Sequence, residues 1–160
     1  GQYAHGNEPS HHTTYMYAYS GEHYKIADKV RYINNELYTD EPDGLSGNED
    51  CGQMSAWYIL SSMGFYPVNP SNGAYVFGSP LFDEVSLNIP GQNKFKISAK
   101  NNSDENIYIQ SVSLNGEDYK YSYITHKQIL KGGELKFVMG PNPNKNFGTE
   151  KKYRPKSIVY

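Results

Sequence analysis

The chain has 160 residues, which is enough for one domain with a real core or for two small lobes. Its 15 Lys and Arg residues against 17 Asp and Glu residues give a net charge of −2, which favours neither a nucleic-acid ligand nor an anionic membrane surface. No apolar run approaches the ~20 residues that span a bilayer. The single cysteine, Cys51, excludes an internal disulfide, and we expect it to be a packed thiol.

Three helices are predicted in the first 70 residues. Residues 10–19 fit one helix, although their alternating tyrosines also fit a strand. Residues 22–38 place apolar side chains at the spacing of an amphipathic helix that faces a core. Residues 51–64 are apolar on nearly every side, which predicts a buried helix that ends at Gly64.

After Pro70 the hydrophobic period changes to two. Strands are predicted in five segments, at 74–78, 84–89, 94–99, 106–114 and 134–140. Their spacing of roughly ten residues is typical of antiparallel sheets packed as a sandwich. We expect hairpin connections at 101–106 and at 114–118, where Asn115-Gly116 is a strong turn signal. The segment 139–148 is predicted to be an exposed loop, and the basic tail 149–160 to be partly disordered.

A first polar cluster lies in the stretch AHGNEPSHH and contains His5, Asn7, Glu8, His11 and His12. Adjacent histidines point in different directions on a helix, and no HExxH motif or cysteine partner is present, so the spacing argues against zinc. Asn and Glu oxygens suit a hard cation such as calcium better. The alternative is a helix start, because Glu, Pro and Ser all favour a first turn.

A second polar cluster precedes the third helix and contains Asp43, Asn48, Glu49, Asp50 and Gln53. One interpretation is a helix cap, in which Asn48 or Asp50 accepts hydrogen bonds from helix N–H groups. An aspartate held among such donors would have a low pKa and stay ionised, which suits a general base that activates water. Both interpretations are open from the residues alone.

The stretches YAHGNEPSHHTTYMYAY, DGLSGNEDCGQMSAWYILSSMGFYPVNP and YVFGSPLFDEV, in this order, resemble the C-terminal part of glycoside hydrolase family 92. NIYIQSVSLNG and GGELKFVMGPNPNKNFG continue the resemblance, which covers all but the last dozen residues. Members of that family are calcium-dependent, exo-acting, inverting α-mannosidases, with a β-sandwich domain joined to an (α/α)6 barrel. The resemblance implies an α+β chain in which residues 1–68 are the closing helices of the barrel and residues 69–160 form an antiparallel β region.

The resemblance also implies roles for the two clusters. Asp50 would be the catalytic base, with Glu49 as the second candidate and with Asn48 and Gln53 as orienting partners. Glu8 would be a calcium ligand beside Asn7, and His11 or His12 would contact the sugar or orient Glu8. The general acid of the family lies upstream of GNEPSHH, so we expect the 160-residue chain alone not to hydrolyse mannosides.

The implied partners are α-mannose-containing glycans, with α-1,2 linkages expected, and the upstream part of the same polypeptide. The first residue is Gly and no signal-like segment follows, so we expect the chain to begin inside a longer or processed product. The usual location of family members implies a periplasmic, cell-surface or secreted location. Two alternatives stay open: a non-catalytic carbohydrate-binding β-sandwich module with a tyrosine-rich face, and another helical-barrel glycosidase that acts on glucosides.

Overall fold

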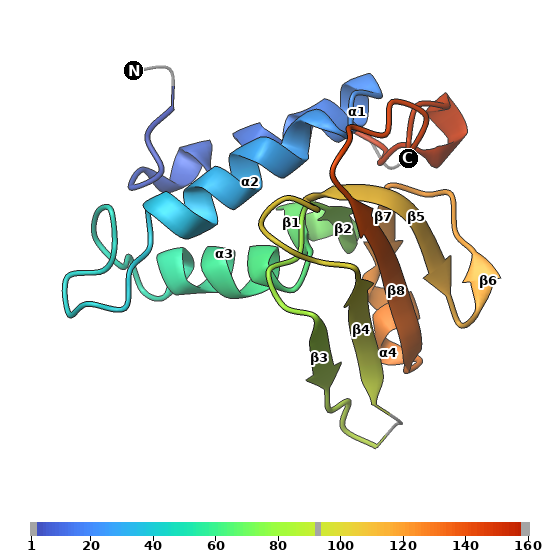
Figure 1. Cartoon of the computed structure of the whole chain (residues 1–160). Coiled ribbons are helices and arrows are strands. Elements are labelled where there is room, and N and C mark those ends of the chain that lie inside the picture. The colour runs from blue at the N-terminus through green and yellow to red at the C-terminus, as the bar shows by residue number, and fades with distance from the viewer. Residues whose placement is uncertain (1–2, 92–93, 158–160) are drawn as a thin grey trace.

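A computed structural model describes residues 3–91 and 94–157 of the chain (Figure 1). The first part is helical and contains η1 (Glu8–Ser10), η2 (Thr13–Met16), α1 (Tyr17–Ser20), α2 (Lys25–Glu36) and α3 (Gln53–Ser62). The strands are β1 (Phe65–Asn69), β2 (Ala74–Phe77), β3 (Glu84–Leu87), β4 (Phe95–Lys100), β5 (Tyr108–Leu114), β6 (Glu117–Asp118), β7 (Tyr123–Thr125) and β8 (Gly133–Gly140). Short helices η3 (Pro70–Asn72), α4 (His126–Leu130) and η4 (Lys151–Tyr153) lie between or after them. The chain is therefore a mixed α and β structure, as the sequence predicts.

The strands form two sheets, one ordered β1-β2-β7 and the other β3-β4-β8-β5-β6. All pairs are antiparallel except β4 and β8, which run parallel. The expectation of purely antiparallel sheets is thus wrong at this pair. The physical reason is that β8 enters the sheet between β4 and β5 after a long crossover through β7 and α4, and long crossovers permit parallel pairing.

The two predicted hairpins have different outcomes. Asn115 and Gly116 adopt φ values of 54° and 86° between β5 and β6, which confirms the tight turn predicted there. The prediction for 101–106 is wrong, because this segment joins β4 to β5 and β8 lies between these two strands. A sequence pattern identifies a turn, but it does not reveal that a later strand separates the two arms.

Residues 10–19 do not form a single helix or a strand. They form the last residue of η1, a connection, η2 and α1, which ends at Gly21 with φ 85°. Thr13 and Thr14 are weak helix formers, which agrees with the tighter 3-10 turn at that point. Glycine suits this position because L side chains rarely adopt a φ of 85°.

The second predicted helix is confirmed as α2, whose buried face includes Ile26, Val30 and Ile33. The third is confirmed as α3, but the prediction that it is buried on all sides is wrong. Trp57 is fully buried, whereas Ile59 is 53% exposed. Among the described residues, none of the helices is both long enough and apolar enough to cross a membrane.

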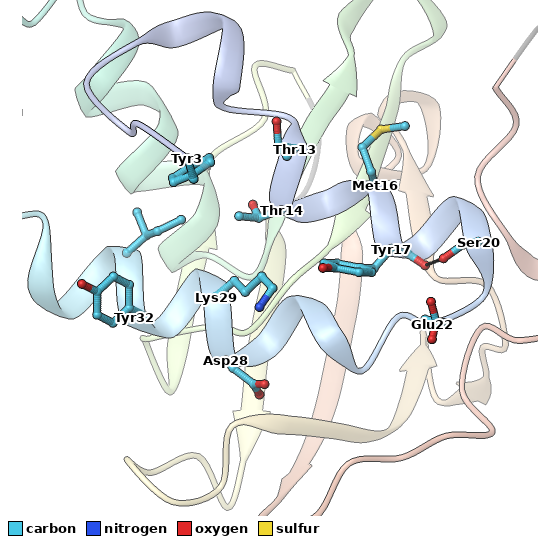
Figure 2. A pocket seen from close by; sticks show the side chains of 11 residues that line it. Tyr3, Thr13, Thr14, Met16, Tyr17, Ser20, Glu22, Asp28, Lys29 and Tyr32 are labelled. Carbon is cyan, nitrogen blue, oxygen red and sulfur yellow. Dashed lines mark hydrogen bonds between the residues drawn. The ribbon is translucent and has the colours of Figure 1, made fainter. Parts of the chain in front are cut away.

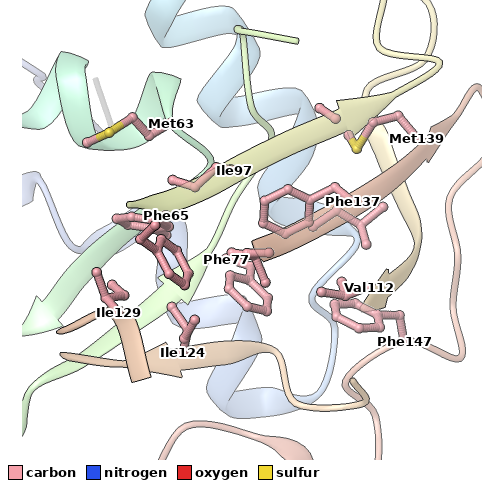
Figure 3. Packing of buried hydrophobic residues seen from close by; sticks show 14 residues of the cluster. Met63, Phe65, Phe77, Ile97, Val112, Ile124, Ile129, Phe137, Met139 and Phe147 are labelled. Carbon is pink, nitrogen blue, oxygen red and sulfur yellow. The ribbon is translucent and has the colours of Figure 1, made fainter. Parts of the chain in front are cut away.

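Two hydrophobic clusters hold the molecule together. In Figure 3, Phe65 of β1, Phe77 of β2 and Phe137 of β8 point toward one another between the two sheets. The second cluster surrounds Tyr15 and Trp57 in the helical part. The expected domain boundary between residues 68 and 69 falls within β1, which pairs with β2. This domain boundary stays a prediction.

Buried polar contacts also join the helices to the sheets. The guanidinium of Arg31, on α2, donates to Ser79 Oγ at 3.0 Å, to the carbonyl oxygen of Ser103 at 3.3 Å and to Asn102 Oδ1. His23 Nε2 lies 2.9 Å from the carbonyl oxygen of Phe77. These bonds fix the orientation of α2 over the β region. The helical part is therefore held in place as a support for the loops before η1 and before α3.

The C-terminal segments are more anchored than the sequence predicts. Phe147 is buried in the loop expected to be exposed. In the tail, residues 151–153 form η4, and Ser122 N donates to the carbonyl oxygen of Tyr153 at 2.9 Å. Residues 158–160 of the predicted disordered tail lie outside the described residues.

Candidate functional site

Two glycines bring the two polar clusters into contact. A Cβ on Gly6 would lie 2.1 Å from the carbonyl oxygen of Ser46, and a Cβ on Gly47 would lie 2.9 Å from the Cα of Gly6. The loop before η1 therefore packs backbone to backbone on the loop before α3. Because each glycine precedes an Asn-Glu pair, this contact places the GNEPSHH and GNEDCGQ stretches side by side.

His11 is buried at the junction where the two loops meet. Its Nε2 atom is 2.9 Å from the carbonyl oxygen of His5, and its Nδ1 atom is 3.1 Å from Gln53 Nε2. Since a carbonyl can only accept, Nε2 carries the proton and Nδ1 accepts from the Gln53 amide. Burial lowers the pKa of His11, which favours this neutral form. The structure thus brings two predicted site residues, His11 and Gln53, into direct contact.

His5 belongs to an ordered chain of hydrogen bonds. Its Nδ1 atom lies 2.7 Å from the Tyr3 hydroxyl, and its Nε2 atom lies 2.6 Å from the Tyr38 hydroxyl. Tyr38 donates to the carbonyl oxygen of Met54 at 2.9 Å, so it accepts from His5 Nε2, and Tyr3 donates to Nδ1. Burial lowers the pKa of His5 to about 4, with the nearby His11 adding to the effect. His5 is therefore a neutral structural bridge between the first loop and α3.

Aromatic rings enclose the two histidines. Trp57 Nε1 donates to the carbonyl oxygen of His11 at 3.0 Å, and its ring centroid lies 4.4 Å from that of His5. Tyr66 receives a hydrogen bond of 3.2 Å from Gln53. The site-supporting residues that were not predicted from the sequence are Tyr3, Tyr38, Trp57 and Tyr66. Their only signal was the aromatic content of the sequence, which does not indicate which rings converge.

Glu8 and Asp50 face each other across the junction. The neighbouring Glu8 carboxyl raises the pKa of Asp50, first through a hydrogen bond between the two groups and then through its negative charge, to which Glu49 adds. The same hydrogen bond lowers the pKa of Glu8. The expectation that Asp50 has a low pKa among helix N–H donors is therefore wrong, because the neighbouring Glu8 carboxyl raises this pKa instead.

The N-cap residue of α3 is Gly52, and Glu49, rather than Asp50 or Asn48, is the side chain that accepts hydrogen bonds from the first turn of this helix. Its Oε1 atom accepts from Ser55 N at 3.1 Å, and its Oε2 atom accepts from Ser55 Oγ at 2.9 Å. Asp50 and Cys51 follow in the left-handed region, with φ values of 48° and 58°. Cys51 is exposed, which contradicts the expectation of a packed thiol.

The remaining predicted residues are at the surface. Asn7 and Asn48 are exposed on the two loops that Gly6 and Gly47 join. His12 is also exposed, and it precedes η2 without a side-chain capping bond. Asp43 is exposed on the preceding loop and makes no contact that ties it to the carboxyl pair among the described residues. The structure therefore gathers Glu8, His11, Asp50 and Gln53 and leaves His12 outside this group.

The donor chemistry at Glu8 fits a hard cation. Among the described residues, no N–H or hydroxyl group donates to the buried Glu8 Oε1 atom, and a second carboxyl, Asp50, lies beside Glu8. Uncompensated carboxylate oxygens are the ligands that Ca²⁺ prefers. Within the described residues no group of three or more His, Cys, Asp or Glu side chains converges as a complete metal site.

A wide groove of about 910 Å³ lies on the helical part (Figure 2). Tyr3 and the η2–α1 segment line one side, and α2 lines the other. Tyr32 and Met16 on its walls are 60% and 45% exposed. The helical part thus presents a partly apolar surface between the η2–α1 segment and α2.

Solved structures of known proteins have the same fold. An α-mannosidase of family GH92 from Bacteroides thetaiotaomicron is 41% identical and superposes with a TM-score of 0.94 over 100% of this chain and 22% of its own. An inverting mannosidase of the same family and organism is 43% identical, with a TM-score of 0.92 over 98% of this chain and 21% of its own. A protein of Arthroderma benhamiae named an uncharacterized secreted glycosidase is 33% identical over 156 residues, or 96% of this chain and 20% of that protein.

The chain spans about a fifth of the length of these relatives. The sequence model of the Glycosyl hydrolase family 92 catalytic domain matches residues 1–141, which include both motif loops and all eight strands of the described residues. The chain therefore belongs to glycoside hydrolase family 92.

Proposed function

We propose that this chain is the C-terminal part of the catalytic region of an inverting, calcium-dependent exo-α-mannosidase that hydrolyses α-mannosidic linkages in glycans, with α-1,2 linkages preferred. The observation that carries the proposal is the pairing of Glu8 with Asp50 where Gly6 and Gly47 join the two motif loops. The family membership and the two relatives that are mannosidases by name support it.

In this proposal Asp50 is the general base. An inverting glycosidase needs a base that takes a proton from water on one face of the sugar and an acid that protonates the leaving oxygen on the other. Asp50 is exposed on its loop, so its carboxyl is accessible to water, and the raised pKa makes its ionised form a stronger base. Glu49 is less suited, because Ser55 occupies both of its oxygens. The acid would come from the upstream part of the polypeptide, with its carboxyl ~6.5–9.5 Å from that of Asp50.

Glu8 would hold the calcium ion through its unpartnered oxygen. When bound, the ion would supply positive charge beside the carboxyl pair and ligand positions for the 2- and 3-hydroxyls of mannose. Asn7 and Asn48, exposed on the same two loops, would donate hydrogen bonds to sugar hydroxyls. His11 and Gln53 are hydrogen-bonded to each other and would keep the base of the site rigid. His12 is exposed and would contact the sugar only from the edge of the site.

We further propose that α2 and α3 are closing helices of an (α/α)6 barrel. The groove of about 910 Å³ and the exposed Ile59 on α3 give these helices apolar faces suited to further helices from the upstream polypeptide. Relatives about five times as long supply the length for such helices. A secreted or periplasmic location is proposed with it, and the name of the Arthroderma relative supports secretion.

The carbohydrate-binding alternative receives no comparable support. Stacking on a sugar would require aromatic rings gathered on one exposed face. Among the described residues the large exposed aromatic side chains are Tyr32, Phe82 and Tyr121, which lie on α2, in the β2–β3 connection and in the β6–β7 connection.

The test uses the complete enzyme that contains this chain, as wild type and as Asp50→Asn, with Asp43→Asn as a matched control on an exposed loop carboxylate. Each is incubated with calcium and an α-1,2-mannobiose, and the released anomer is followed by proton NMR. We expect release of β-mannose and a loss of kcat of roughly 10³-fold or more in Asp50→Asn only. Near-normal turnover by Asp50→Asn would contradict the base assignment. Release of α-mannose would contradict inversion, and faster cleavage of a glucobiose would favour the glucosidase alternative.

A further inference from the structure

Glu49 binds the first turn of α3 in three places. Its carboxylate accepts from the backbone N–H and the hydroxyl of Ser55, at 3.1 Å and 2.9 Å. Its own carbonyl oxygen accepts from Met54 N at 3.3 Å. The residue before the proposed base is therefore tied to the helix that follows it.

The segment between these contacts has an unusual backbone. Asp50, Cys51 and Gly52 have φ values of 48°, 58° and 90°, so three successive residues are left-handed. L side chains rarely adopt this region, and such a conformation persists only where the surroundings hold it. Gln53 N bonds to the carbonyl oxygen of Asp50 at 3.3 Å, but no side chain of Asp50 or Cys51 contributes a bond to α3 among the described residues. Glu49 and Ser55 therefore close a ring around the strained segment.

We infer that Glu49 is a positioning residue, which holds the left-handed segment so that the Asp50 carboxylate faces Glu8. This inference rests on the proposed function, because it assigns Glu49 a task in presenting the base. Both Glu49 oxygens point to donors on Ser55, so the side chain cannot turn toward water without breaking the ring. The ring and the Gly6–Gly47 contact together hold the loop of Asp50 against the loop of Glu8.

The discriminating variant is Glu49→Gln. The glutamine carbonyl can accept from Ser55 N and its amide can donate to Ser55 Oγ, so the ring survives, but an amide cannot take a proton from water. Glu49→Ala removes the ring altogether. A positioning role predicts that Glu49→Gln keeps kcat within about tenfold of wild type, while Glu49→Ala loses ~100-fold in kcat with little change in KM. Ser55→Ala keeps one of the two bonds and should fall between them.

The variants are made in the complete enzyme, and amide hydrogen exchange of the peptide covering residues 48–57 is measured beside the kinetics. Faster exchange at the start of α3 in Glu49→Ala, but not in Glu49→Gln, is the expected result. Equal loss of kcat in Glu49→Gln and Glu49→Ala would overturn the inference and identify Glu49 as the base. If Asp50→Asn is fully active, the base assignment of the proposed function fails, whereas the exchange difference still reports whether the ring exists. Identical exchange in all variants would show that it does not.

Discussion

The closest approach between the two motif loops gives a sharp prediction at Gly6. In Gly6→Ala the new Cβ would lie 2.1 Å from the carbonyl oxygen of Ser46. Carbon and oxygen in ordinary contact are roughly 3.3 Å apart, so the loops must separate by about 1.2 Å. The obstacle is backbone on both sides and cannot rotate away. Overpacking of this kind costs about 1–3 kcal/mol of stability, and a shift of ~1 Å between positioned groups lowers a rate by ~100-fold.

The assay compares kcat, KM and thermal unfolding of the complete enzyme carrying Gly6→Ala with those of Gly116→Ala. The control glycine has φ 86°, and a Cβ on it would meet nothing within 4 Å, so alanine there strains the backbone without pushing on a neighbour. We expect Gly116→Ala to lower stability by about 1 kcal/mol and to leave kcat unchanged. Gly6→Ala should lose kcat beyond what its stability explains. Wild-type kcat in Gly6→Ala would refute the idea that this contact places Glu8 beside Asp50.

Two further predictions concern the polar contacts between the helices and the sheets. Burial lowers the pKa of His23 to about 4 from an ordinary 6.5, so below pH ~6.5 the unfolded chain binds a proton that the folded chain does not, and stability falls as the pH drops toward 4. Between pH 7 and pH 5 the loss in the free energy of unfolding amounts to about 2 kcal/mol. Thermal unfolding of His23→Gln should therefore depend less on pH than that of wild type. An unchanged pH dependence would assign the effect to other groups. Arg31→Lys should lower the free energy of unfolding by about 3 kcal/mol in urea titrations, because an ammonium cannot reproduce the fork that reaches Ser79, Asn102 and Ser103. A loss no larger than that of an exposed Lys29→Ala control would contradict this.

Much of the secondary structure follows from local pattern. The helical spacing around Val30 and the alternation in β4, β5 and β8 are strong because each element buries one side against a core. The pattern failed where a distant segment decides the outcome. The parallel β4–β8 pair depends on a crossover that no window of sequence reveals. Ile59 has the residue type of a buried position, yet it is exposed because exposure depends on what packs against the helix.

For the candidate site, too, some features follow from the local sequence and others only from the fold. The sequence by itself identified the two stretches that carry the carboxylates and amides, because such runs of polar residues before apolar helices are visible without a fold. The residue types alone did not separate Glu49 from Asp50, since neighbouring carboxylates have the same chemistry and differ only in the backbone that holds them, and only the family resemblance put Asp50 first. In the tertiary structure Asp50 lies in the left-handed region beside Glu8, whereas Glu49 is directed onto Ser55, and this difference supports the proposal that Asp50 is the base. Motif composition is a local property, whereas the direction of a side chain is set by contacts between loops that are far apart in the sequence.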